Sequence, residues 1–263
     1  MKLTHTEEVK KMNYGFYDEY SIARNQFHNR KFPMEYLDDI LVRLAYHSSA
    51  IEGNTISLPQ TVSIILHNTV PERTSLRELY EIENHRGAFA LMLEKVQDKQ
   101  PLSISLVKDI HERLMDKLIV DRGQFKSYEN AILGADFDTA SPQETPVLMQ
   151  QLVDNQNYRL EIADTDVEKI EAIMDTHIQF ERIHPFSDGN GRTGRLVMNY
   201  SLLNEGFPPV IIQTEDKAEY LELLSEQNVK GLTRYAMKQM VTEEKRQAKF
   251  IAKEKSQSQE LDF

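Results

Sequence analysis

The sequence contains no cysteine among its 263 residues. This absence excludes disulfides, thiolate metal sites and cysteine nucleophiles, and it removes the usual reason to expect a small extracellular domain. Basic residues are also few, since 31 Lys and Arg stand against 42 Asp and Glu, for a net charge of −11. We therefore expect no general electrostatic attraction to nucleic acid or to an anionic membrane surface, and any anionic ligand needs a local site.

Long hydrophobic runs are missing as well. The opening residues, MKLTHTEEVKK, contain no apolar stretch that could serve as a signal peptide, and no uninterrupted apolar run reaches the ~18 residues of a spanning helix. We therefore expect a chain that neither inserts into a membrane nor is exported, with the cytoplasm as its default location. With 40% apolar residues, the chain can form a substantial core in one large domain or two modest ones.

Strictly alternating apolar and polar residues are scarce, whereas helical spacing recurs through most of the chain, so we predict an all-α fold. A helix face begins at Met34 and is ended by Gly53 and Asn54. Further helices are predicted over 74–97, 103–118 and 145–159. Mixed alternation over about 128–144 predicts a small β-hairpin, which would form a flap. The charged tail after Thr242 predicts a helix that frays into disorder.

The stretch HPFSDGNGRTGR, from His184 to Arg195, holds one histidine, one aspartate, two arginines and three glycines. A periodic helix precedes it and must end near His184, because Pro185 disfavours the α conformation in the residue before it. Helical spacing resumes at Val197, so the stretch joins two helices and its glycines lie at a helix N-terminus. A core segment needs none of these residue types.

Four interpretations of this stretch compete. The glycines match G-x-G-x-x-G, but the dinucleotide fingerprint follows a strand, and here a helix precedes it. A metal site of His177, His184 and Asp188 lacks a third strong ligand, and His177 is better explained as a buried, hydrogen-bonded histidine. A plain turn between helices is the third interpretation, and it accounts for Phe186 as an anchor in the core. It does not account for so dense a set of functional groups.

The fourth interpretation is a triphosphate site with an adjacent base. Backbone amides at a glycine-rich helix N-terminus form an anion site, and two arginines add positive charge. Asp188 supplies a hard oxygen suited to Mg²⁺, which commonly takes one or two carboxylates together with phosphate oxygens and water. His184 is the only side chain of the stretch that can accept a proton near neutral pH. We prefer this interpretation.

At these residues the sequence resembles the Fic (filamentation induced by cAMP) family. The family signature, H-x-F-x-[DE]-G-N-G-R-x-x-R, is matched at all of its fixed positions: His184, Phe186, Asp188, Gly189, Asn190, Gly191, Arg192 and Arg195. The resemblance covers roughly Ser75 to Leu224. It implies an all-α, Fic-type helical bundle with a β-hairpin flap, divided into an N-terminal helical region over 1–74, a Fic core over 75–224 and a helical tail over 225–263.

The resemblance also implies roles for individual residues. His184 would be the general base that deprotonates a Ser, Thr or Tyr hydroxyl of a target protein, which then takes AMP from ATP. Asp188 would hold Mg²⁺, and the flap would align the target segment by main-chain pairing. The remaining implied contacts with ATP are an anion hole from Gly189, Asn190 and Gly191, a β-phosphate ligand in Arg192, a γ-phosphate ligand in Arg195, and nucleoside contacts from Asn199 and Tyr200.

A second family feature lies upstream. Regulated Fic proteins carry an inhibitory helix with [ST]-x-x-x-E-[GN], and Ser48, Glu52 and Gly53 match it, on a helix over about 35–53 that precedes the core. The resemblance implies that Glu52 pairs with Arg195 and leaves ATP misaligned. A simple helix end would also explain Gly53, but a carboxylate in the last turn opposes the helix dipole by ~0.3–1 kcal/mol, so a partner is expected.

Three functions follow as hypotheses. The first is an autoinhibited protein adenylyltransferase that uses ATP and Mg²⁺ and modifies a target protein or itself. The second is a hydrolase of the same fold, in which Glu52 positions water to remove AMP. The third is a nucleotide-binding regulator without turnover. Direct DNA binding is disfavoured, because the region after Gly231 has no obvious basic recognition helix. The sequence leaves open the target, the physiological nucleotide and the formation of homo-oligomers.

Overall fold

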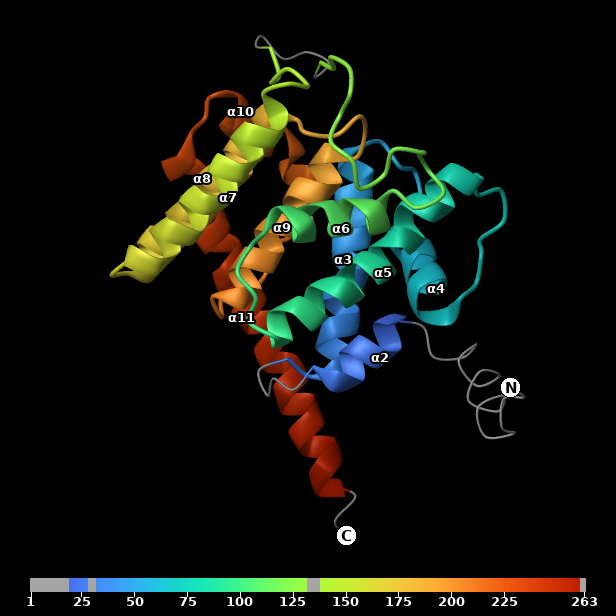
Figure 1. The fold of residues 1–263 in the computed structure, drawn as a ribbon. Coiled ribbons are helices and arrows are strands. Elements are labelled where there is room, and N and C mark those ends of the chain that lie inside the picture. Colours follow the sequence, from blue (N-terminus) through green and yellow to red (C-terminus); the bar gives the residue numbers. More distant parts are fainter. Residues whose placement is uncertain (1–18, 28–31, 132–137, 261–263) are drawn as a thin grey trace, which may run out of the picture.

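The computed structural model describes residues 19–27, 32–131 and 138–260 (Figure 1). These residues contain helices and connecting segments but no β-strand, so the all-α prediction is confirmed. The helices, in chain order, are α2 (Glu19–Gln26), α3 (Met34–Ile51), α4 (Leu58–His67), α5 (Leu76–Gln97), α6 (Ile104–Leu114), α7 (Thr145–Ile162), α8 (Asp166–Ile183), α9 (Asn190–Asn204), the 3₁₀ turn η1 (Thr214–Asp216), α10 (Lys217–Ser225) and α11 (Val229–Glu260).

Local signals account for most helix ends. Ser75 caps α5 by accepting the Glu78 amide, and α3 stops at Ile51 before Gly53, whose φ of +99° suits glycine. Two predicted ends were inaccurate. Helix α6 ends four residues before the predicted 118, because Lys117 turns the chain with a left-handed φ of 60°. Helix α7 continues to Ile162.

Helix α9 lies at the centre of the molecule, and every residue from 192 to 203 is buried. One hydrophobic cluster packs on α9 from the side of α3, α5 and α6, through residues such as Leu196 and Tyr200. A second cluster packs from the side of α8, α10 and α11, through Met198 and Leu202. The helix that begins inside the glycine-rich stretch is therefore held from both sides (Figure 1).

The end of the chain departs from the prediction. The predicted helix after Thr242 is present as part of α11, but within the described residues it continues to Glu260 without fraying, and it extends past the rest of the molecule (Figure 1). Buried contacts with α3 explain the difference, since Glu243 accepts hydrogen bonds from Arg43 at 2.6 and 2.8 Å and from Tyr36 at 2.8 Å. These contacts extend the ordered helix beyond the point where its charge pattern predicts disorder.

The predicted β-hairpin over about 128–144 falls partly on residues 132–137, which lie outside the described residues. Its described flanks form no strand, so the hairpin prediction is wrong there. Side chains join the flanks instead: Thr139 Oγ1 donates to the Asn130 carbonyl at 2.8 Å, and Lys126 Nζ donates to Thr139 Oγ1 at 3.2 Å. The backbone is thereby held by side chains and not by a cross-strand ladder.

The division at 74/75 and 224/225 stays a prediction. The two hydrophobic clusters combine residues from all three segments, for example Ile51, Met198 and Tyr235 in the second cluster.

Within the described residues, no helix combines the length and the apolar character that a membrane crossing requires.

Candidate nucleotide site at the start of α9

The stretch from His184 to Arg195 begins where α8 ends. His184 is the C-cap of α8 and takes a left-handed φ of 51°, which reverses the chain before Pro185. Asn130 holds this turn from the flap side by donating to the His184 carbonyl at 3.2 Å and to the Phe186 carbonyl at 2.8 Å. The position of the histidine is therefore set by both the helix end and the base of the predicted flap.

Phe186 anchors the loop in the core, as predicted. Its side chain is fully buried and stacks on the ring of His111 with centroids 3.6 Å apart. The Asn190 side chain brackets it, accepting the Phe186 amide and donating to the Phe186 carbonyl, both at 2.8 Å. Because these bonds occupy the Asn190 side chain, only its backbone amide is available to a ligand.

His111 supports the loop from α6. Its Nδ1 lies 2.9 Å from the Gly123 amide, which can only donate, so the ring proton belongs on Nε2. Nε2 in turn donates to the Asp188 carbonyl at 3.0 Å. Burial lowers the pKa of His111 to about 4, so the ring stays neutral and keeps this arrangement near neutral pH.

The start of α9 forms a cradle of backbone amides. Gly189 adopts a left-handed φ of 78°, and the first helical bond runs from the Thr193 amide to the Gly189 carbonyl at 3.0 Å. The amides of Asn190, Gly191 and Arg192 precede that bond and point out of the helix end. A helix N-terminus of this kind binds anions through its amides and its dipole.

Arg192 places a cation beside this cradle. Its side chain is only 3% exposed, yet Nε and Nη1 have no hydrogen-bond partner. The nearest carboxylates are Asp188 at 3.5 Å and Glu81 at 3.8 Å. A buried guanidinium with unsatisfied nitrogens is costly, and an anionic ligand in the cleft would satisfy it.

Arg195 lies deeper and is already paired. It donates to Ser48 Oγ through Nε and to the Ser48 carbonyl through Nη2, both at 2.9 Å, and Nη2 contacts Glu52 Oε1 at 2.6 Å. Burial alone would raise the pKa of Glu52, but Arg195 outweighs it and holds that pKa below its usual value. The predicted contact between Glu52 and Arg195 is therefore present, as a charged pair.

The His184 ring is neutral and can therefore accept a proton. Burial lowers its pKa below the usual value, so the ring is neutral near pH 7. Nδ1 lies 3.3 Å from the Glu181 carbonyl, which can only accept, so we assign the proton to Nδ1. This assignment leaves Nε2 with a free lone pair.

Asp188 directly precedes the cradle in the sequence. Burial raises its pKa, but Arg192, Arg77 and the Gly189 amide together bring it below the usual value, so Asp188 is ionised. No group of three or more His, Asp or Glu side chains with metal-binding geometry occurs in the described part of the chain. A single ionised carboxylate fits Mg²⁺ that arrives with phosphate oxygens and water.

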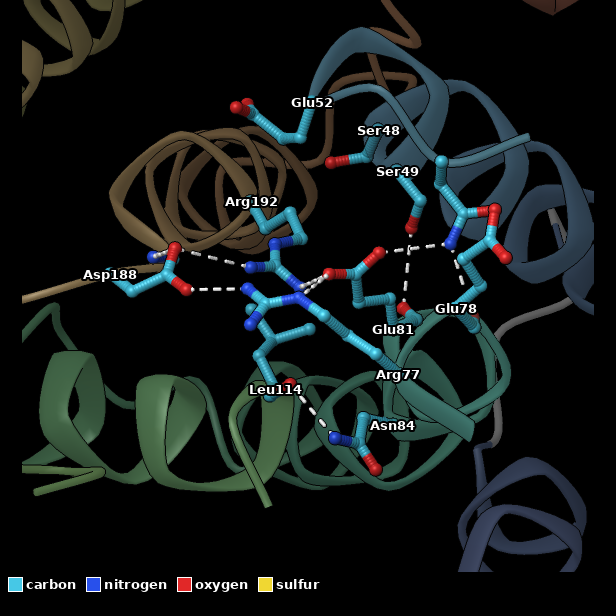
Figure 2. A network of polar contacts seen from close by, with 12 residues as sticks. Ser48, Ser49, Glu52, Arg77, Glu78, Glu81, Asn84, Leu114, Asp188 and Arg192 are labelled. Atoms are coloured by element: carbon cyan, nitrogen blue, oxygen red, sulfur yellow. Dashed lines mark hydrogen bonds and ion pairs between the residues drawn. The ribbon is translucent and has the colours of Figure 1, made fainter. Parts of the chain in front are cut away.

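His184, Asp188, Arg192 and the residues of the amide cradle line one cleft of about 390 Å³. Figure 2 shows Asp188, Arg192 and Glu52 from its walls together with neighbours on α5. The lining residues are Glu52, Gly53, Asn54, Arg77, Glu78, Glu81, His184, Ser187, Asp188, Gly189, Asn190, Gly191 and Arg192. A larger hollow of about 740 Å³ lies between α3 and α11, but it is remote from the glycine-rich stretch.

Three predicted nucleotide contacts, Arg195, Asn199 and Tyr200, are not among the residues that line the cleft. Asn199 is fully buried, and its side chain bonds the Arg195 carbonyl and both backbone groups of Val210 at 2.7 to 2.9 Å. The Tyr200 hydroxyl donates to the Gln100 carbonyl. Both side chains hold α9 to its neighbours, so this geometry does not support their assignment to a nucleoside.

The competing metal site also fails to assemble. His177 is buried, and its Nε2 lies 2.8 Å from the Tyr220 hydroxyl, away from the residues that line the cleft. Burial lowers its pKa to about 3, as for a neutral histidine inside the core. The interpretation of His177 as a buried, hydrogen-bonded histidine is supported.

Sequence reasoning missed several residues that shape the site. Arg77, Glu81 and Asn54 line the cleft, and Lys126 and Asn130 brace the loop from the flap base. Arg77 and Glu81 are spaced like an ordinary surface ion pair on a helix. Only the packing of α5 against the loop, visible in Figure 2, gives them a place in the site.

Comparison with known proteins agrees with this geometry. The model of the Fic/DOC family matches residues 101–202. Protein adenylyltransferase fic-1 of Caenorhabditis elegans is 33% identical over 192 residues, which cover 71% of this chain and 36% of that protein. Residues 101–202 of the chain belong to the Fic/DOC family.

Other relatives extend the comparison. Protein adenylyltransferase Fic of Drosophila willistoni is 31% identical over 196 residues, covering 72% of this chain and 38% of that protein. A Fic-domain signalling protein from Bacteroides thetaiotaomicron superposes with a TM-score of 0.76 at 25% identity, covering 89% of this chain and 96% of that one. The chain thus spans little more than a third of the length of these curated relatives, but nearly all of the bacterial structure.

Proposed function

We propose that this Fic protein is a protein adenylyltransferase, which transfers AMP from ATP to a Ser, Thr or Tyr hydroxyl of a target protein. One observation carries the proposal: a neutral His184, an ionised Asp188 and a buried Arg192 with unsatisfied nitrogens line the same cleft. The names of the curated relatives support the same activity. The intact G-N-G-R sequence favours nucleotidyl transfer over a kinase-like reaction.

In the proposed reaction, His184 Nε2 takes the proton of the target hydroxyl, whose oxygen attacks the α-phosphorus. The bond from that phosphorus to the diphosphate breaks, and diphosphate leaves. The amides of Gly189, Asn190 and Gly191 face the phosphates, and Arg192 and Arg195 balance their charge. Asp188 would hold Mg²⁺, which neutralises phosphate charge when bound. The segment over 128–144 would align the target.

We further propose that Glu52 inhibits this reaction, as in the class with an N-terminal inhibitory helix. The support is the 2.6 Å contact between Glu52 Oε1 and Arg195 Nη2. Ser48 on α3 also accepts a hydrogen bond from Arg195 and holds its guanidinium against that helix. A γ-phosphate would have to displace the carboxylate before it could use Arg195. Replacement of Glu52 by glycine would free the guanidinium and leave the helix end unchanged.

The test is intact mass spectrometry of the Glu52→Gly protein after incubation with Mg²⁺ and each nucleoside triphosphate in turn. A mass gain of one AMP on the protein itself or on an added target, with ATP only, is expected. His184→Ala in the same background is the matched control and should abolish the gain. No adduct with any nucleotide would reject the transferase and favour a nucleotide-binding regulator.

One observation favours a second candidate. The ionised Glu52 lines the same cleft as His184, so it could position water and remove AMP from a modified target. Incubation of a pre-adenylylated protein with the wild-type chain should then release AMP. Loss of this release in Glu52→Gly would support hydrolysis, whereas release that persists without Glu52 would reject its role.

A further inference from the structure

Four charged side chains form a closed ring at the mouth of the cleft (Figure 2). Arg77, on the first turn of α5, donates from Nη2 to Asp188 Oδ2 at 2.8 Å and from Nε to Glu81 Oε1 at 3.0 Å. Arg192 closes the ring with contacts of 3.5 Å to Asp188 and 3.8 Å to Glu81. Two cations and two carboxylates therefore alternate, and the ring is neutral.

The two oxygens of Asp188 are used differently. Oδ1 accepts the Gly189 amide at 2.6 Å and faces Arg192, so it belongs to the catalytic loop itself. Oδ2 is bonded to Arg77, which comes from another helix. A divalent cation approaching Asp188 competes with Arg77 for Oδ2, because two positive charges at hydrogen-bond range repel each other.

Arg77 is the member of the ring that can move. Its side chain is 59% exposed, whereas that of Arg192 is 3% exposed. Glu81 stays in place, because its Oε2 accepts Asn54 Nδ2 at 3.0 Å just beyond the end of α3. Arg77 can therefore release Asp188 and keep its bond to Glu81.

We propose that Arg77 is a second gate on the nucleotide site, which blocks the oxygen of Asp188 that a metal–nucleotide complex needs. This gate rests on the proposed function and is separate from Glu52. The contact of Glu52 with Arg195 closes the end of the cleft that receives the terminal phosphate, and Arg77 closes the end that receives the metal. Release of Glu52 alone then leaves the site partly closed.

The experiment measures binding and requires no turnover. An ATP analogue with a methylene bridge between the α- and β-phosphates is titrated calorimetrically into Glu52→Gly and into Glu52→Gly/Arg77→Gln, over a series of Mg²⁺ concentrations. Exposed ion pairs are weak, so loss of Arg77 should lower the Mg²⁺ concentration for half-maximal nucleotide binding about two- to fivefold. Without Mg²⁺, the substitution should not improve binding.

Arg159→Gln in the same background is the matched control. Arg159 forms a comparable ion pair with Asp175 at 2.5 Å on α7 and α8, outside the cleft, and its loss should leave the Mg²⁺ dependence unchanged. An unchanged dependence in the Arg77→Gln protein would overturn the gate. Weaker binding at every Mg²⁺ concentration would also overturn it and make Arg77 a phosphate ligand. No nucleotide binding by any variant would overturn the proposed function and the gate with it.

Discussion

Arg195 is held by Ser48 on α3 and by Glu52 at the C-cap of that helix. Removing one partner of a buried ion pair leaves an uncompensated charge, which is more costly than the intact pair is favourable. The Glu52→Gly protein therefore contains a buried cation that an anionic phosphate can compensate. This property links nucleotide binding to the contact that we propose to be inhibitory.

Buried histidines predict an acid-sensitive fold. Burial lowers the pKa to about 3 for His85 and His177 and to about 4 for His111, from 6.5. The unfolded chain therefore binds more protons at these sites below about pH 6.5, so the free energy of unfolding falls as the pH is lowered. Glu181 opposes them, because burial raises its pKa to about 7 and the folded state takes up a proton first.

Three of these protons favour the unfolded state and Glu181 opposes one, while the lowered pKa values of His47 and His184 act in the same direction as the other histidines. The free energy of unfolding should therefore fall by at least roughly 2 to 3 kcal/mol per pH unit between pH 6.5 and 4.5. Urea unfolding at several pH values measures this slope. Glu181→Gln removes the opposing group and should steepen the fall, whereas substitution of the exposed His67 by Gln should not change it. A flat profile would contradict the neutral state of these histidines.

The sequence predicted the site residues that belong to a motif of fixed spacing, and it missed the site residues that lie outside such motifs. Ser48 and Glu52 could be paired with Arg195 because both motifs have a defined register. Arg77 could not be placed, since an (i, i+4) pair on a helix surface carries no information about a distant loop. The nucleoside contact predicted for Asn199 stays a prediction that this geometry does not support, because helical spacing alone does not reveal that α9 is buried on all sides.

At the scale of elements, the start of α9 depends on Gly189. Its φ of 78° favours glycine, and a Cβ there would overlap Met115 Sδ. Gly206 has a similar φ of 83° with open space around it, which makes it a matched control. Gly206→Ala should cost only the left-handed strain, about 1 kcal/mol, and Gly189→Ala about 2 to 4 kcal/mol, because Met115 must also move.

Chemical unfolding of both alanine variants measures this difference, and nucleotide binding gives a second readout. Only Gly189→Ala should weaken binding, because only Gly189 shapes the amide cradle. Equal losses of stability in the two variants would mean that Met115 does not constrain the loop.

Most helix extents were predictable from caps and periodicity. The base of the predicted flap was not predictable, because Lys126, Asn130 and Thr139 organise it through their side chains.

At the scale of the whole molecule, the last helix is tied to the first part of the chain. Arg43 on α3 and Glu243 on α11 form a buried pair at 2.6 Å, with side chains 10% and 7% exposed. Glu243→Ala should lower the free energy of unfolding by about 1 to 3 kcal/mol. Arg43 keeps its 2.6 Å contact with Asp39, but it loses one of two carboxylate partners, and the buried Tyr36 hydroxyl loses its acceptor. Charge pattern alone missed this contact, which joins residues 200 positions apart.

Lys253 provides the matched control on the same helix. It pairs with Glu35 at 2.7 Å, but both side chains are more than half exposed. Lys253→Ala should cost less than about 1 kcal/mol. Urea unfolding of the two variants checks the contrast, and similar losses would show that α11 is held by its surface charges and not by the buried pair.

In the proposed mechanism one guanidinium, that of Arg195, serves either Glu52 or the nucleotide. Calorimetric titration of the wild-type, Glu52→Gly and Glu52→Gly/Arg195→Ala proteins with ATP and Mg²⁺ tests it most directly. We predict that Glu52→Gly binds ATP roughly tenfold more tightly than the wild type and that the added Arg195→Ala reverses this gain. Equal affinities for wild type and Glu52→Gly would contradict the claim.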